Sequence, residues 1–269
     1  MAEMRLKPED ILKRHEIAIK KKDEFRSLYD EAYEFALPQR NLYDGFYDGG
    51  VGGSKKMNRV FDATAINSTQ RFANRMQSGI FPPQAKWCRL EAGTDIPADR
   101  KAEAQAALDI YTERLFATIK QSNFDIAIGE FLLDLCVGTA VMMVQPGDDI
   151  NPINFIPVPQ FLVAFEEGAN GQVDNVYRRM RIKGEAIQQQ WRDAVIPPAL
   201  QSKIDLKPTE DVELIEATVF DVKRGDYCYH VIHKESKQEL VYRRMKTSPW
   251  IVSRYMKVAG EIYGRGPLS

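Results

Sequence analysis

The glycine-rich segment Gly49–Lys56, GGVGGSKK, is the stretch that comes closest to a phosphate-binding motif. A phosphate loop needs the pattern GxxxxGK[ST] after a hydrophobic strand, because its backbone N–H groups and its lysine surround the phosphates. No frame of the segment fits this pattern, and no hydrophobic strand precedes it. We interpret it as a flexible loop whose Lys55 and Lys56 could contact the acidic surface of a partner.

Metal-binding and nucleophilic residues are sparse. His230 and His233 lie three positions apart, and in a strand such a pair points to opposite faces, so both cannot bind one metal ion. Local spacing suggests no GxSxG motif and no serine or cysteine triad. The three cysteines (Cys88, Cys136 and Cys228) form no CxxC pair, and we interpret them as buried thiols. The sequence therefore predicts no catalytic residue, cofactor or metal site.

Two stretches are rich in cations: RRMRIK at 178–183 and YRRMK at 242–246. On strands they would place alternate cations on one exposed face. The whole chain has 37 Lys and Arg against 38 Asp and Glu, a net charge of −1, so it has no overall basic field to hold nucleic acid. We therefore favour a solvated or subunit-contacting face over DNA binding, with Arg178, Arg179 and Arg181 as candidate contacts.

Helices are predicted for residues 1–138. Pro8 suits a first helical turn and Leu37-Pro38 ends a helix, which predicts one helix of roughly 40 Å between them. A second helix would begin at Asp62 or Asn58 and close at Gly79.

Two more helices are predicted at 99–121 and 123–138. The helix at 123–138 is apolar on nearly all sides, which is typical of a buried core helix. The helix at 99–121 is amphipathic, and its apolar face consists of Ala104, Ala107, Leu108, Tyr111, Leu115, Phe116 and Ile119.

After Gly138 the sequence changes to short β-branched and aromatic runs separated by turn residues. Hairpin turns are predicted at Asn170-Gly171 and at 224–226, and short helical insertions at 185–193 and 198–204. The predicted strands are TAVMMVQ, INFIPV, FLVAF, VDNVYRRMRI, VELIEATVFDV, YCYHVIH and ELVYRR.

The predicted fold class is α+β. Long N-terminal helices (1–138) come first, and a mostly antiparallel sheet or small barrel (139–269) follows, without the βαβ rhythm of a nucleotide-binding fold. No window approaches 18 uncharged apolar residues, and the N-terminus has no secretory apolar region, so neither a membrane span nor export is expected. Trp87, Trp191 and Trp250 suit either packing anchors or interface hot spots.

Three segments together resemble the head-to-tail connector (portal) proteins of podoviruses, related to those of T7-like and ε15-like phages. The first is Phe61–Leu90, in which a small-residue helix runs into a proline-broken segment and then Trp-x-x-Leu. The second is Pro157–Ile182, a strand, a glycine turn and a strand. The third is Pro249–Ser269, which contains Gly-Glu-x-Tyr-Gly-Arg and adds Tyr263 and Arg265 as candidate contacts.

This resemblance implies a structural subunit and not an enzyme. Twelve subunits would form a ring at one capsid vertex of the virion, made in the cytoplasm of the host bacterium. The ring would form the channel for DNA packaging and DNA ejection. Its partners would be the terminase, the tail adaptor, the major capsid and scaffold proteins, and the double-stranded DNA that passes through. The matched segments belong to the outer wing of the family's subunit, so the stem, clip and crown would lie beyond Ser269.

Two other functions stay open at this point. Another virion structural protein, such as a tail adaptor or scaffold-interacting subunit, could share the order of helices and then sheet, although Gly-Glu-x-Tyr-Gly-Arg favours the connector. A metal-dependent DNA-processing enzyme would need carboxylates gathered in a cleft around Mg²⁺.

Overall fold

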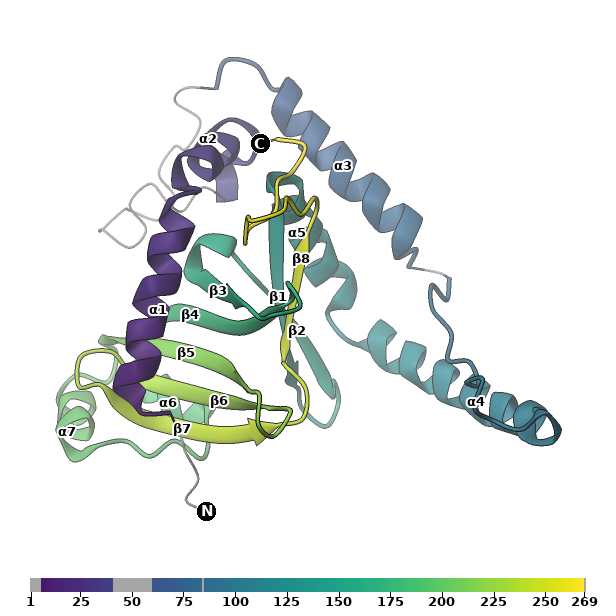
Figure 1. Cartoon of the computed structure of the whole chain (residues 1–269). Coiled ribbons are helices and arrows are strands. Elements are labelled where there is room, and N and C mark those ends of the chain that lie inside the picture. Colours follow the sequence, from purple (N-terminus) through teal and green to yellow (C-terminus); the bar gives the residue numbers. More distant parts are fainter. Residues whose placement is uncertain (1–5, 41–59, 84, 269) are drawn as a thin grey trace.

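Two antiparallel sheets and a projecting helical arm make up the fold (Figure 1). The computed structural model describes residues 6–40, 60–83 and 85–268. Its longer helices are α1 (Pro8–Asp23), α2 (Arg26–Ala36), α3 (Thr64–Ile80), α4 (Ala98–Gln121), α5 (Phe124–Val137) and α7 (Pro198–Leu206). Short turns of helix are η1 (Pro38–Arg40), η2 (Gln160–Leu162), η3 (Gly184–Ala186) and α6 (Ile187–Gln190). None of the helices in these ranges is long and apolar enough to cross a membrane.

The smaller sheet has the strand order β2-β1-β8, and the larger has β3-β4-β5-β6-β7. The first four strands are β1 (Thr139–Pro146), β2 (Ile153–Val158), β3 (Val163–Glu167) and β4 (Val173–Lys183). The others are β5 (Asp211–Asp221), β6 (Asp226–His233), β7 (Gln238–Met245) and β8 (Trp250–Arg254). All pairs are antiparallel, and Val141 of β1 lies opposite both Val158 of β2 and Val252 of β8.

The α+β class and the antiparallel sheet are confirmed, whereas the alternative of a small barrel is wrong. Over the described ranges each sheet keeps two edge strands, β2 and β8 in one and β3 and β7 in the other. The chain passes between the sheets through Pro159 and η2, a turn that directs β3 away from β2. The division into a helical part (1–138) and a β-rich part (139–269) stays a prediction. Helices α1 and α2 pack on strands of the β-rich part, so the two parts share hydrophobic cores.

The main core lies between the two sheets. Val141 and Val158 of the smaller sheet pack with Val163 and Leu214 of the larger one, and all are almost fully buried. Strand β8, which was not predicted, completes this core with Trp250. Gly138 ends α5 with φ +149°, and a Cβ there would lie 2.2 Å from the carbonyl oxygen of Gly264, so this close backbone approach requires glycine.

The predicted single helix 8–37 is two helices, α1 and α2, separated at residues 24–25. The break is one tight turn in which the N–H of Phe25 donates to the carbonyl of Lys22 at 2.9 Å. Helix α1 covers the outer face of the larger sheet with Ile11, while α2 inserts Tyr29 into the core between the sheets. The apolar period runs through the break, so the spacing of residues could not reveal it.

The other helices follow the prediction closely. Asp62 accepts hydrogen bonds from the N–H and the hydroxyl of Thr64 at the start of α3, and the helix ends at Ile80, one residue beyond Gly79. Helix α4 begins at Ala98, and α5 is the predicted buried helix. Both glycine turns, the short helical insertions and six of the seven predicted strands are confirmed. The predicted strand FLVAF at 161–165 is partly wrong, because its first two residues lie in η2 and β3 begins at Val163.

Candidate interaction surfaces

The cations of β4 divide between the two faces of the larger sheet. Arg178 points to the same face as Val176 and Met180 and lies 3.4 Å from Glu216, whose side chain is 1% exposed. The role of Arg178 as a candidate contact stays a prediction, but its side chain is largely internal, with 17% exposed. The physical reason is Glu216, which lies directly opposite Arg178 on β5 and needs a cation once it is buried.

Glu216 belongs to a buried chain of hydrogen bonds. The hydroxyl of Tyr229 donates to Glu216 at 2.5 Å, and the indole N–H of Trp191 donates to the Tyr229 oxygen at 2.9 Å. Burial raises the pKa of Glu216, and the nearby Arg178 opposes that rise. Each member has a bonded neighbour in the core, which fits a structural role and not an open reactive site.

Arg179 and Arg181 point to the opposite face, beside α1. Arg179 forms an ion pair with Glu213, which also accepts a hydrogen bond from Lys234 at 2.9 Å. Burial alone would raise the pKa of Glu213, but Lys234 and Arg179 together lower it. Arg181 is exposed, and its role as a contact stays a prediction. Lys55 and Lys56, with the glycine-rich segment, lie outside the described residues.

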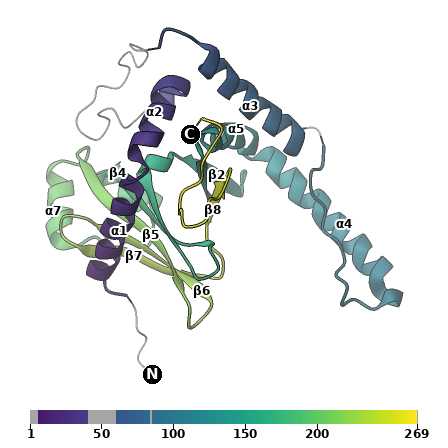
Figure 2. The same cartoon turned by 45° about the horizontal axis from the view of Figure 1, so that its top comes forward.

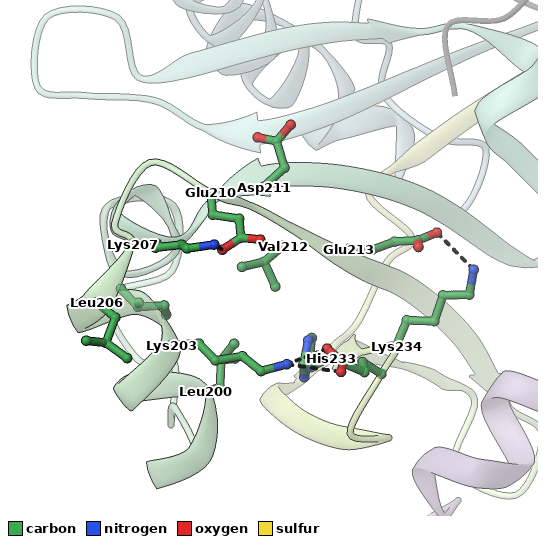
Figure 3. A pocket seen from close by; sticks show the side chains of 12 residues that line it. Leu200, Lys203, Leu206, Lys207, Glu210, Asp211, Val212, Glu213, His233 and Lys234 are labelled. Carbon is green, nitrogen blue, oxygen red and sulfur yellow. Dashed lines mark hydrogen bonds and ion pairs between the residues drawn. The ribbon is translucent and has the colours of Figure 1, made fainter. Parts of the chain in front are cut away.

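A pocket of about 740 Å³ opens between α7, β5 and the β6–β7 turn (Figure 3). Leu200, Ile204 and Val212 give it an apolar wall. Its cations are already paired with neighbouring acids: Lys203 lies 2.8 Å from Glu235. Lys207 lies 3.5 Å from Glu210, and Lys234 lies 2.9 Å from Glu213. The three lysines that line the pocket therefore leave no unpaired lysine there for a phosphate or carboxylate ligand.

His230 and His233 bind different neighbours. His230 Nδ1 lies 2.5 Å from Glu239 Oε1, and His233 Nδ1 lies 2.8 Å from Ser236 Oγ. Burial lowers the pKa of His233. In the described ranges no group of three or more His, Cys, Asp or Glu could hold a metal ion. The metal-dependent alternative therefore has no supporting cluster there.

Tyr263 lies in the core and not on the surface. Its ring is fully buried, 5.1 Å from Phe165 and 5.5 Å from Phe25, measured between ring centroids. The next residue, Gly264, accepts a hydrogen bond from the Tyr29 hydroxyl at 2.7 Å and donates to Thr139 at 2.8 Å. A partner could reach Tyr263 only if this C-terminal segment moved.

Arg265 binds Glu261 through two hydrogen bonds of 2.9 and 2.6 Å, and its side chain is 40% exposed. The pair stands at the edge of a hollow of about 520 Å³ between α2 and residues 260–265. Phe25, Leu28 and Ile262 supply its apolar lining, and its rim also carries Lys21 and Glu24.

The three tryptophans are packing anchors. Trp191 and Trp250 are buried, and the Trp250 indole N–H donates to Thr218 at 3.0 Å. The ring of Trp87 stacks on Phe124 at 5.6 Å and packs edge-on against Phe116 at 5.3 Å. The cysteine prediction is correct for Cys136, whereas Cys88 is exposed and Cys228 is half-buried.

The surface that sequence reasoning missed is the helical arm, which we define as α4 with residues 85–97. Figures 1 and 2 both show α4 projecting away from the sheets. Tyr111 is 58% exposed, Ile110 56% and Leu115 36%, although Tyr111 and Leu115 belong to the predicted apolar face of the helix. The amphipathic pattern of residues 99–121 indicates an apolar helix face, but it does not indicate whether the surface that covers this face belongs to the same chain.

The comparisons with known proteins concern nearly the whole chain. Residues 8–269 match a family model described as bacteriophage head to tail connecting protein. None of the curated proteins compared with the sequence gave a match.

Proposed function

The chain belongs to the bacteriophage head-to-tail connecting protein family, and from this premise we propose that it is a portal subunit, one of twelve that form a ring at a single capsid vertex. Members of this family are structural proteins of the virion at the junction of head and tail, so head and tail components are partners of this chain. The proposal adds the ring, its number of subunits and its central channel.

The observation that carries the proposal is the family match over residues 8–269. In addition, the described part of the chain leaves Tyr111 and Leu115 on the apolar face of the arm exposed. A closed ring needs interfaces in which one face of a subunit meets a different face of its neighbour. Obligate interfaces usually bury more than about 2,000 Å². An arm that extends from the body can provide one of these interface faces, so no additional large domain is needed.

The net charge fits a channel through which DNA slides. Strongly cationic walls would hold the DNA, because every phosphate contact strengthens binding. The chain has a net charge of −1, and Arg178, Arg179 and Arg244 form ion pairs with acids of the same sheet. We propose that the ring lets DNA pass during packaging and ejection, and that it docks the terminase and then the tail adaptor. The major capsid and scaffold proteins would surround it.

The mass and shape of the native particle test this proposal. Light scattering and negative-stain imaging should give a ring of twelve subunits with a central hole, for this chain or for one extended past Ser269. If both remain monomeric at every salt and protein concentration, the portal assignment is overturned. In that case the tail-adaptor function is tested next, by binding to isolated heads and tails.

A further inference from the structure

The arm carries an apolar stripe that the described part of the chain leaves largely exposed, with only Ala104 and Leu108 half-buried. The stripe consists of Ala104, Ala107, Leu108, Tyr111 and Leu115, which repeat at three- and four-residue steps and so lie on one side of α4. Tyr111 is 58% exposed and Leu115 36%. A stripe of this spacing normally packs against another element.

The adjacent side of α4 is already occupied by residues 85–97 of the same chain. The N–H of Leu90 donates to the Thr112 hydroxyl at 3.2 Å, and the N–H of Ala92 donates to Gln105 at 3.1 Å. Arg89 binds Asp109 through two hydrogen bonds of 2.9 and 3.1 Å. These contacts fix the segment on that side, so the apolar stripe stays open to a partner.

A matching surface lies at the other side of the subunit. The hollow beside α2 has an apolar lining of Phe25, Leu28 and Ile262, and its volume of about 520 Å³ has room for one large side chain. The hollow also has charged residues of both signs, namely Lys21, Glu24 and the Arg265–Glu261 ion pair, and α2 adds Glu31. Glu24 and Glu31 are exposed there, and neither forms an ion pair within the described part of the chain.

Two arginines stand beside the stripe, on the side of α4 that also carries the exposed Glu103. Arg100 and Arg114 flank the stripe on α4, are exposed, and form no ion pair in the ranges that the structure describes. The exposed Arg100 and Arg114 can therefore pair with Glu24 and Glu31 while the stripe covers the apolar lining of the hollow, and such matched contacts favour specific association.

The positions of the two surfaces decide what kind of partner fits. In both views α4 extends from one side of the body, and α1 and α2 lie on the opposite side (Figures 1 and 2). One chain therefore cannot bring its own stripe to its own hollow. A second copy can, and it then offers its own stripe to a third copy, which is the head-to-tail pattern that closes into rings.

We propose that the stripe of α4 in one subunit packs on the hollow beside α2 of a neighbouring copy of the chain, with Tyr111 entering the hollow and Arg114 facing Glu24 and Glu31. This inference rests on the proposed ring, because it identifies the surfaces through which the ring closes.

Assembly of point variants gives the first test. Tyr111→Asp should raise the protein concentration needed for half-maximal assembly at least about tenfold, because a desolvated aromatic anchor is replaced by a charge. Val222→Asp is the matched control, since Val222 is 82% exposed on the β5–β6 turn, outside both surfaces. Circular dichroism and thermal unfolding of both variants should match the wild type.

Crosslinking identifies the two surfaces directly. In a Cys88→Ser background, a chain with both Tyr111→Cys and Leu28→Cys should give a ladder of covalent oligomers with a short bis-maleimide. Each single variant alone should give none, and an equal mixture of the two single variants should give dimers.

The outcomes separate this inference from the proposed ring. A wild-type chain that never assembles overturns both. Wild-type rings that form equally well from Tyr111→Asp, together with no ladder from the double-cysteine chain, overturn the interface and leave the ring standing. A head or tail component that binds the stripe of wild-type monomers would assign it to another protein and would also overturn the interface.

Discussion

Two regions of the molecule, the body formed by the two packed sheets and the projecting arm, are stabilised in different ways. In the body, apolar side chains such as Val163, Phe165 and Leu214 are fully buried, and Trp191, Tyr229 and Glu216 bond to one another. Beyond the Trp87 cluster at its base, the arm is held mainly by polar contacts such as Leu90 to Thr112, while Tyr111 faces outward. The body is thus complete within one chain, whereas the arm has an apolar face fit for another.

The largest expected loss of folding stability comes from a substitution in the body. Phe165→Ala removes a fully buried ring that packs on Tyr263, and it should lower the free energy of unfolding by about 3–5 kcal/mol. Tyr111→Ala in the arm should change it by about 0.5 kcal/mol or less, because that ring is exposed. Urea unfolding of the unassembled chain measures both, and similar losses for the two variants would contradict the contrast.

A smaller effect is expected where α1 meets the larger sheet. His15 is 4% exposed, and its ring centroid lies 6.0 Å from that of Tyr177. Burial first, and then the nearby cations Lys22, Lys234 and Arg179, lower the pKa of His15 to about 4, while the nearby Glu213 acts in the opposite direction.

Between pH 6.5 and about 4 the unfolded chain therefore binds a proton that the folded chain does not. Stability should be fully present above pH 6.5 and should fall as the pH drops, by at most about 3 kcal/mol from this group. Unfolding of wild type and of His15→Gln at a series of pH values isolates the effect. Curves that stay parallel across this range would exclude His15 as the source.

The smallest expected effect is on the free energy of local opening within the arm. Thr112→Val removes the hydroxyl that accepts from the N–H of Leu90, and should make opening of residues 85–92 easier by roughly 1 kcal/mol. Hydrogen exchange should show faster exchange at Leu90 and an unchanged rate in β5. Thr118→Val is the matched control, because the Thr118 hydroxyl bonds only to its own helix, at the carbonyl of Arg114. An equal increase of the exchange rate at Leu90 in both variants would mean that the Thr112 hydroxyl does not hold residues 85–92 on α4.

Much of the fold follows from local signals in the sequence. Asp62 and Gly138 mark helix ends, and the change to β-branched runs after Gly138 marks the strands. The break between α1 and α2, strand β8 and the open sheets depend on contacts between distant residues, which leave no local pattern. Arg178 points inward for the same reason, since its partner Glu216 lies on another strand.

The candidate contacts were harder to predict than the fold. Tyr263 belongs to a family-like motif, but its ring packs in the core, so a matching motif does not by itself place a residue on a surface. The sequence indicates that Tyr111 lies on an apolar helix face, but it does not show whether the surface that covers this face comes from the same chain. Only the position of α4 relative to the sheets distinguishes the two cases (Figure 1).

The pairing of β1 with β8 affects how the protein is made. Thr139 lies opposite Arg254, so the ribosome must synthesise all of the larger sheet before β1 receives its second neighbour. During that time one edge of β1, with Val141 and Met143, has unsatisfied backbone groups and can pair with another nascent chain. Contacts between residues so far apart in the sequence form slowly. Slow formation favours chaperone dependence, and it favours aggregation when expression is faster than folding. A lower expression level or a lower temperature should therefore increase the yield of folded chain, because fewer unpaired β1 edges are then present together.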